Sequence, residues 1–320
     1  MLAGMGLTNR CLKESEIRTV MTAALEVADL SGKRVLIIIP DGTRSGPFDL
    51  LFRLLYDVLG EKVAALDYLI ALGTHPAMSD EALQSHLGVG AAELEGRYAG
   101  VGIFSHEWDN PDALTTFGAL SKDELEKLLK EHAPELDLGF LPKTVPVALN
   151  KRIRDYDRLI VCGPVFPHEV VGFSGGTKYF FPGIAGPELI DFTHWLGALL
   201  TSYRLIGVKR TAVRDVIDRA ATFIKTPKLF CCPVVMDEAL AGLYIGDGKA
   251  AWSQAVDLSA QINIVRVDHP YQQALSIMPE QYDDLWTAAK GMYKVEPVIA
   301  EGGEVIIYAP HVTEISYTHG

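Results

Sequence analysis

The chain has 320 residues, 48% of them hydrophobic and 22% charged, a balance typical of a globular protein with a large buried core. Its formal net charge of -12 argues against a nucleic-acid partner, because binding to phosphates requires a basic face. The N-terminal segment lacks a signal-peptide pattern, and the apolar runs are too short to cross a bilayer. We therefore expect a cytoplasmic protein.

The four cysteines indicate neither a zinc site nor a disulfide framework. Cys11 and Cys162 stand alone in the sequence, and Cys231 and Cys232 are adjacent, so no CxxC pair is present. Adjacent cysteines rarely bridge each other. We expect reduced thiols, as is usual in the cytoplasm.

The first half of the chain alternates between helical and strand patterns. Glu14–Leu30 has helical periodicity, and Arg34–Pro40 is a continuous apolar run of the kind found in strands buried on both faces. Phe48–Leu59 predicts a second helix and Val63–Leu72 a second strand. Further strands are predicted at Gly100–Ser105, Thr144–Asn150 and Asp157–Cys162.

The second half predicts more elements of both kinds. Helices are expected at Glu188–Thr201, Val208–Ala221, Ala250–Ala260 and Tyr282–Tyr293, and strands at Lys228–Val235, Gln261–Asp268 and Glu304–Ala309. The alternation favours a Rossmann-like, doubly wound, mostly parallel sheet. We predict a large N-terminal α/β domain over residues 1–260 and a smaller α/β domain over 261–320.

Four polar motifs directly follow predicted strands. They are DGTR at 41–44, GTHP at 73–76, SHEWD at 105–109 and GPVFPH at 163–168. Ligands of parallel sheets collect outside the carboxyl ends of the strands. The four motifs are therefore expected to meet in one crevice.

The stretch from Gly163 to His194 carries the strongest functional signal. His168 precedes Lys178 by 10 residues, with Ser174, Gly175 and Gly176 between them, and His194 follows Lys178 by 16. Glycines allow backbone to approach a ligand, while lysine and histidine can be nucleophile, metal ligand or proton acceptor. The GxxxxGK[ST], GxSxG and GxGxxG motifs are absent, which argues against a P-loop, an α/β-hydrolase and a conventional dinucleotide dehydrogenase.

Several polar residues allow both a chemical and a structural role. Arg44 could hold a carboxylate with a two-pronged hydrogen bond, or form a surface ion pair while Asp41 caps a helix. His75 could be a general base, although loop histidines before proline are more often structural. His106 and Asp109 are expected to give supporting hydrogen bonds. For His194, spacing alone leaves open a satisfied core residue or a metal ligand.

Taken together, these motifs resemble the nickel-pincer nucleotide lactate racemase family over most of the chain, and most specifically from Asn150 to His194. The resemblance implies a cofactor that is a pyridinium mononucleotide with two sulfur donors, tethered through a thioamide to Lys178. It places nickel on His194. It also assigns four more residues to the cofactor site: Asp41, Ser174, Gly175 and Gly176.

The same resemblance implies racemisation or epimerisation of a 2-hydroxy acid by reversible hydride transfer to this nucleotide. His75 and His168 would be the acid/base pair on opposite faces of the substrate, and Arg44 would bind its carboxylate. Lys290 and Thr287 would reach the substrate from a second domain that closes over an interdomain site. Enzymes of cofactor synthesis would be transient partners.

Two loops depart from the usual pattern of that family. Thr287 stands where glutamine is common, and Ser45 follows Arg44 where proline is usual. We therefore expect a larger or more polar hydroxy acid, of sugar type for example, rather than lactate. The chain also stops soon after its last predicted strand, so we expect a short or truncated C-terminal domain.

Two other classes of protein remain as alternatives. His75, His106 and His168 could bind a divalent metal in a hydrolase, but this leaves the Ser-Gly-Gly-Thr-Lys block without a role. A non-catalytic protein that binds a hydroxy acid or nucleotide would tolerate the loss of His75 or His168 with binding intact.

Overall fold

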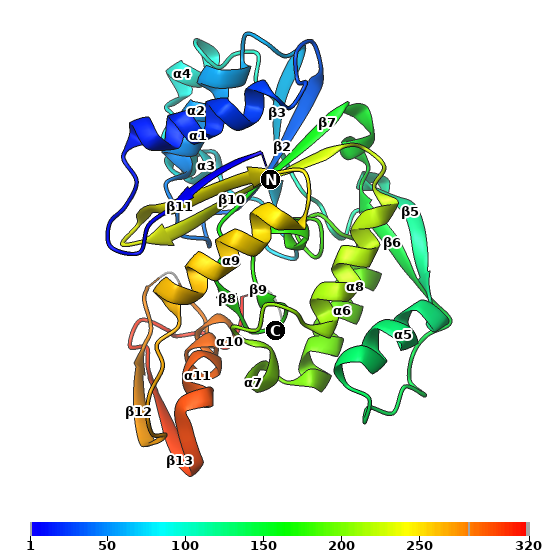
Figure 1. Ribbon diagram of the computed structural model, residues 1–320, viewed down its shortest axis with the longest axis vertical. Coiled ribbons are helices and arrows are strands. Elements are labelled where there is room, and N and C mark those ends of the chain that lie inside the picture. Colours follow the sequence, from blue (N-terminus) through cyan, green and yellow to red (C-terminus); the bar gives the residue numbers. More distant parts are fainter. Residues whose placement is uncertain (1, 281, 318–320) are drawn as a thin grey trace.

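The computed structural model describes residues 2–280 and 282–317, arranged around one seven-stranded sheet (Figure 1). Its order is β1-β11-β10-β7-β2-β3-β4. The neighbours from β10 to β4 are parallel, whereas β1 and β11 add an antiparallel edge. The prediction of a mostly parallel α/β sheet is confirmed. The strands are β1 (Ala3–Gly6), β2 (Arg34–Pro40), β3 (Ala65–Ala71), β4 (Ile103–Ser105), β7 (Arg158–Cys162), β10 (Lys228–Met236) and β11 (Ala239–Gly246).

A hydrophobic core covers each face of this sheet. Along β2, Leu36 and Ile38 pack into one core, and Val35 and Ile37 pack into the other, because successive side chains of a strand point to opposite faces. All four are fully buried, as the continuous apolar run predicted. The core that contains Val35 and Ile37 also includes side chains of α1 (Glu14–Glu26) and α2 (Phe48–Leu59). The core that contains Leu36 and Ile38 includes side chains of α6 (Pro187–Leu200), α8 (Ala212–Ala220) and α9 (Lys249–Asn263).

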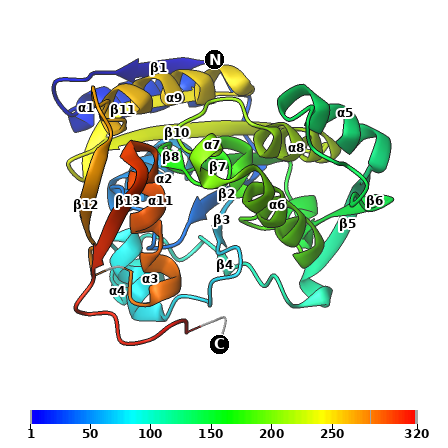
Figure 2. The ribbon, with the colours of Figure 1, turned by 90° about the horizontal axis from the view of Figure 1, so that it is seen from below.

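Three small two-stranded sheets surround the central one. They pair β5 (Leu114–Ser121) with β6 (Thr144–Asn150), β8 (Pro167–His168) with β9 (Gly172–Phe173), and β12 (Tyr271–Ile277) with β13 (Ile299–Tyr308). The remaining helices are α3 (Asp80–Leu87), α4 (Ala91–Glu95), α5 (Lys122–His132), α7 (Ser202–Leu205), α10 (Leu285–Ala288) and α11 (Lys290–Val295). In Figures 1 and 2, β12, β13 and α11 lie together, outside the central sheet.

The structure corrects several predicted elements. Thr144–Asn150 is a strand, but it pairs antiparallel with β5 and not with the central sheet. The predicted strand Gln261–Asp268 is wrong, because α9 continues to Asn263 and no strand follows until Tyr271. Ile262 and Ile264 produced the apolar pattern there by packing against the core. The predicted helix Tyr282–Tyr293 consists of α10 and α11. The division into domains at residue 260 stays a prediction, and α9 crosses that position.

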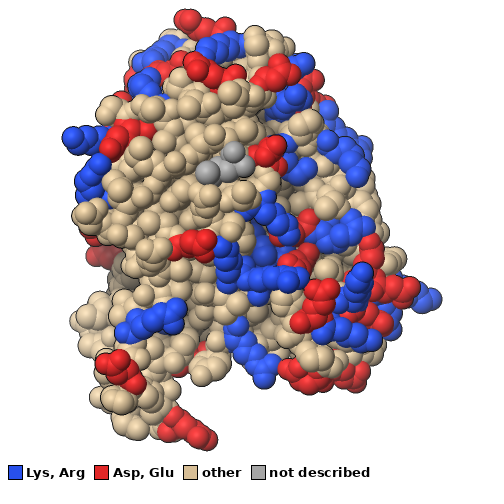
Figure 3. All heavy atoms as spheres, viewed as in Figure 1, with Lys and Arg blue, Asp and Glu red and all other residues tan. Residues whose placement is uncertain are grey.

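Charge and hydropathy agree with a globular surface. On the face shown in Figure 3, acidic and basic side chains are mixed, so the net charge of -12 is not gathered there into one acidic patch. Among the described helices, none is long and apolar enough to cross a membrane. The four cysteines are free thiols.

Candidate active site

The polar loops that follow β2, β3, β4 and β7 leave the sheet at one edge, because these four strands are parallel neighbours. A hydrogen bond of 2.6 Å between His75 Nδ1 and Asp41 Oδ2 joins the loop after β3 to the loop after β2. The predicted convergence of these two motifs is confirmed by this contact. The edge therefore brings together residues that are 34 positions apart in sequence.

Asp41 and His75 form a carboxylate–imidazole pair. Asp41 is buried, and its other oxygen accepts a hydrogen bond of 2.6 Å from the Thr43 hydroxyl. Burial alone would raise the pKa of Asp41, but the hydrogen bond and charge of His75 outweigh it and lower this pKa. The carboxylate is thus ionised and accepts the Nδ1 proton of His75. The His75 side chain is 38% exposed, and its Nε2 is left for a proton acceptor role.

His168, at the end of β8, has a different environment. It is buried, and its Nδ1 accepts a hydrogen bond of 3.1 Å from the backbone N–H of Val170. This contact places the proton of the neutral ring on Nε2. Burial lowers the pKa of His168 well below its usual range, and the charges of Lys178 and Arg44 lower it further. His168 is therefore a neutral imidazole with an Nε2–H group, unlike the carboxylate-backed His75.

Lys178 lies in a short 3-10 helix, Gly176–Tyr179, and is buried. Within residues 2–280 and 282–317, its amine makes no hydrogen bond or ion pair. Burial lowers the pKa of this amine well below its usual range, and the nearby Arg44 charge lowers it further. A lowered pKa increases the unprotonated fraction of the amine, which is the nucleophilic form. Lys178 is therefore suited to forming a covalent bond.

The Ser174-Gly175-Gly176 turn is packed against the protein itself. The Ser174 hydroxyl donates to Pro164 O at 2.7 Å and accepts from Phe166 N at 3.0 Å, so it stabilises the loop. Gly175 and Gly176 have φ of 78° and 60°, in the region that favours glycine. A Cβ atom on Gly175 would lie 2.4 Å from the Val165 side chain. The role of these three residues at a cofactor stays a prediction.

We expect Gly175→Ala to destabilise the protein. The positive φ and the overlap with Val165 should together cost about 2–4 kcal/mol in the free energy of unfolding. Urea denaturation would measure the loss. Gly248→Ala is the matched control, because a Cβ there meets nothing within 4 Å and its φ is negative. Equal stability of the two variants would contradict this account of the turn.

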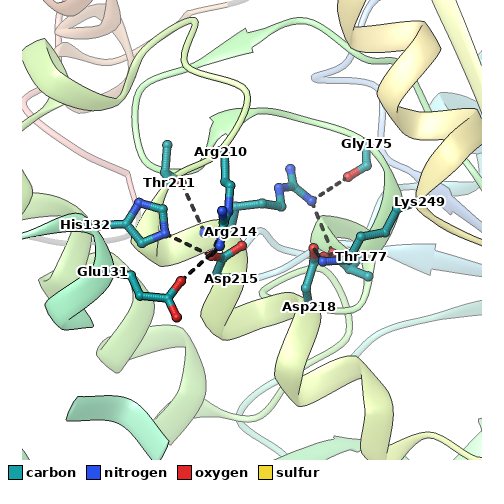
Figure 4. A network of polar contacts seen from close by, with 10 residues as sticks. All are labelled: Glu131, His132, Gly175, Thr177, Arg210, Thr211, Arg214, Asp215, Asp218 and Lys249. Carbon is teal, nitrogen blue, oxygen red and sulfur yellow. Dashed lines mark hydrogen bonds and ion pairs between the residues drawn. The ribbon is translucent and has the colours of Figure 1, made fainter. Parts of the chain in front are cut away.

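Arg214 and Trp252 support this turn from behind, and neither was predicted from the sequence. Arg214 is buried, and Figure 4 shows it donating to Gly175 O at 3.2 Å and Thr177 Oγ1 at 3.1 Å. Its guanidinium lies over the Trp252 ring, 4.3 Å from the centroid. The indole N–H of Trp252 donates to Ser174 O at 2.8 Å. These contacts fix the backbone that carries Lys178.

His194 lies on α6 with its ring at the surface of the site. Its Nδ1–H donates to the carbonyl of Ile190 at 2.8 Å, which leaves the Nε2 lone pair unused. Although the ring remains accessible to solvent, surrounding protein removes part of its water and lowers its pKa, and the Lys178 charge adds to this effect. A ring nitrogen fixed by a backbone carbonyl is the usual arrangement for a histidine that binds metal through its other nitrogen.

A cavity of about 660 Å³ opens between these loops and α11. The residues with polar side chains that line it include Arg44, Ser45, His168, Glu169, Lys290 and Lys294. The Arg44 guanidinium donates to the Thr43 hydroxyl at 2.9 Å and forms no ion pair with any described residue. Lys290 Nζ lies 3.7 Å from Glu169. The cavity thus offers cationic groups to an anionic ligand.

Arg44, His168 and Lys290 line this cavity, whereas the other eight predicted site residues do not: Asp41, His75, Ser174, Gly175, Gly176, Lys178, His194 and Thr287. His75, Lys178 and His194 lie beside it, and Lys178 is close enough for its charge to lower the pKa of His194. Thr287 uses its hydroxyl to donate to Asp284 at 2.6 Å, at the start of α10. A role for Thr287 at the substrate stays a prediction.

His106 has the supporting role expected of it. Its Nε2 hydrogen bonds to Ala185 O at 3.0 Å, and its Nδ1 accepts from Asn150 at 3.3 Å. Burial lowers the pKa of His106 to about 4. The parts of the chain that are described contain no group of three or more His, Cys, Asp or Glu residues that could hold a metal ion. Among the described residues, His75, His106 and His168 thus do not form such a group.

Comparison with known proteins gives a consistent result. The sequence matches the family described as lactate racemase N-terminal domain over residues 10–133 and 129–204. It is 26% identical to a lactate racemase of Thermoanaerobacterium thermosaccharolyticum over 284 residues, covering 87% of this chain and 60% of that protein. It is 30% identical to a lactate racemase of Lactiplantibacillus plantarum over 178 residues, covering 54% of this chain and 41% of the relative. The chain thus spans at most about three fifths of either curated relative.

Two solved structures have a fold similar to that of this chain. A protein from Thermotoga maritima superposes with a TM-score of 0.82 and 32% identity, covering 96% of this chain and 73% of that one. The lactate racemase apoprotein from Thermoanaerobacterium thermosaccharolyticum gives a TM-score of 0.73 with 22% identity, covering 96% and 70%.

Proposed function

Because this chain belongs to the lactate racemase family, we propose that it interconverts the configurations of a 2-hydroxy acid at the edge of the sheet described above. The observation that supports this most directly is the pair of unlike imidazoles with a buried, unpartnered lysine. His75 is backed by an ionised carboxylate, and His168 is buried and neutral. An enzyme that inverts a 2-hydroxy acid through hydride transfer needs a group on each face of the substrate to take or return the hydroxyl proton.

The residues present fit the nickel-pincer nucleotide. We propose that Lys178 tethers it, since its amine is unpartnered within the described chain and its pKa is lowered. His194 would be the protein's ligand to nickel through the free Nε2. A single histidine is consistent with a group that brings its own carbon and sulfur donors. When bound, this nucleotide would supply a reversible acceptor for hydride.

The chain's own residues would handle the substrate and its proton. Arg44 is placed to bind the carboxylate at the cavity, with Lys290 on the other side. His75 Nε2 would take the hydroxyl proton of one enantiomer while Asp41 holds the Nδ1 proton in place. His168 Nε2–H would donate to the oxygen when the other configuration forms. The roles of the two imidazoles would exchange in the reverse direction.

We propose that the substrate is larger or more polar than lactate. The cavity of about 660 Å³ lies within the size range of sites for small organic ligands, and it is lined by Ser45, one of the two positions at which the sequence is expected to depart from the family pattern. Its cationic side chains favour an acid over a neutral sugar. The nucleotide would occupy part of the neighbouring space.

Intact-protein mass spectrometry tests the proposed tether. After co-expression with the enzymes of cofactor synthesis, we expect a mass adduct together with about one bound nickel per chain. The adduct should disappear in Lys178→Ala. The matched control is Lys294→Ala, because this exposed lysine lies at the same cavity and should keep the adduct. An unmodified chain that carries zinc, or an adduct that survives in Lys178→Ala, would sink the proposed tether.

A further inference from the structure

Glu169 is a carboxylate held among cationic groups, and no role was assigned to it from the sequence. It follows His168 directly and begins the turn between β8 and β9. Its side chain is only 16% exposed, and it lines the cavity together with Arg44 and Lys290. A carboxylate in such a place is costly to bury unless its charge is used.

The two oxygens of Glu169 face different parts of the site. Oε1 lies 3.7 Å from Lys290 Nζ on α11, and Oε2 lies 3.6 Å from His168 Nδ1. The contact with Lys290 is longer than a direct hydrogen bond, so it is an attraction between opposite charges. The contact with His168 is one of proximity only, because that ring is neutral and its Nδ1 accepts from Val170. The attraction to Lys290 acts in a cavity with partly excluded water, where charges interact more strongly than at an open surface. One side chain thus connects α11 with the loop that carries His168.

The Glu169 side chain is an ionised carboxylate. Burial alone would raise its pKa, but neighbouring positive charge, to which Lys290 contributes, and a backbone hydrogen bond lower this pKa below its usual range. Among the described residues, Glu169 is the acidic partner of Lys290, and Arg44 lines the same cavity. A second polar contact, from the Ser202 hydroxyl to Glu296 at 3.2 Å, joins the end of α11 to the body of the protein.

We propose that Glu169 is a positioning residue, which holds Lys290 and with it α11 against the His168 loop so that Lys290 can meet the carboxylate of the substrate. The part about the substrate carboxylate rests on the proposed function. The part about Glu169, Lys290 and α11 rests on geometry alone. Glu169 acts through Lys290 and does not itself contact the reacting atoms. A substrate carboxylate would then complete an arrangement in which Lys290 lies between two negative charges.

Hydrogen–deuterium exchange tests the positioning without any cofactor. In Glu169→Gln, amides of α11 (Lys290–Val295) should exchange roughly threefold or more faster, while those of β2 stay unchanged. Glu169→Asp, which keeps the charge, should restore most of the protection. The matched control is Glu126→Gln, which removes a surface ion pair with Lys122 of the same 3.7 Å length. Unchanged exchange in α11 of Glu169→Gln would overturn the proposal.

Kinetics on the cofactor-loaded enzyme test whether Glu169 places Lys290 to meet the substrate carboxylate. Glu169→Gln should raise KM about tenfold and change kcat less than about threefold, since binding is lost more than chemistry. In a double-mutant cycle, adding Lys290→Met should cause little further increase, because both changes remove one interaction. A fall in kcat with KM unchanged, or additive effects, would contradict it. If the enzyme inverts no hydroxy acid at all, the proposed function fails, while the exchange result still decides the contact between Glu169 and Lys290.

Discussion

Replacing His75 or His168 by asparagine is expected to lower the rate of racemisation about 10²–10⁴-fold, the usual contribution of a positioned acid or base. The reason is that each imidazole handles the proton on one side of the substrate, and inversion needs both. Binding of the hydroxy acid should change little, because we propose that Arg44 and Lys290, which line the cavity, hold its carboxylate. Initial rates from both enantiomers, with calorimetric titration of binding, would measure the two effects separately.

Two further variants sharpen this result. Asp41→Asn should lower the rate as well, since an amide no longer accepts the His75 proton as an ionised carboxylate does. His269→Asn is the control, because this histidine is exposed and far in sequence from the site loops. A protein that merely binds its ligand would show unchanged binding in every variant and no inversion in the unmodified chain. That outcome would favour the non-catalytic alternative.

Acid is expected to destabilise the fold through His106. Its pKa falls from an ordinary 6.5 to about 4 on folding, because burial disfavours the charged ring. Between these values the unfolded chain binds more protons than the folded one, so stability is present above pH 6.5 and is lost as the pH falls toward 4. At 1.36 kcal/mol per pH unit, the loss from this residue alone is about 3 kcal/mol.

Denaturation in urea at a series of pH values measures this effect. The slope of the unfolding free energy against pH should be shallower in His106→Gln, whose amide can also bond to Ala185 but does not titrate. Buried His168 has a lowered pKa of the same sign, so part of the slope should remain in this variant. Identical slopes for the variant and the unmodified protein would show that the pKa of His106 does not change on folding, and would contradict this account.

The sequence predicted the edge of the sheet because the relevant signals are local. A buried strand that ends in a polar loop is recognisable as an apolar run followed by polar residues, as at Arg34–Pro40 before Asp41. Parallel strands then bring such loops together at one edge of the sheet. Lys178 and His194 were singled out in the same way, from a glycine-rich loop and the helix after it, and their roles stay predictions. The hydrogen bond from His194 to Ile190, one turn earlier, depends only on helix geometry.

Contacts between distant segments could not be predicted in this way. Arg214 lies in a charged helix, and nothing near it in sequence shows that it is buried under the Ser-Gly-Gly turn. Glu169 contacts Lys290 across more than a hundred residues. The side chains of Val165 and Trp252 lie where a Cβ on Gly175 or Gly176 would be, and the sequence pattern does not show this packing. Side-chain packing decides these points, and periodicity carries no information about it.

The central claim is best tested by incubating the cofactor-loaded enzyme with single enantiomers of 2-hydroxy acids in deuterium oxide. Chiral chromatography with mass detection would follow both configuration and isotope. We predict that at least one acid larger or more polar than lactate is inverted, and that the product retains its original hydrogen at the α-carbon. Inversion accompanied by deuterium at that carbon, or no inversion of any acid by protein that carries the Lys178 adduct, would contradict the account.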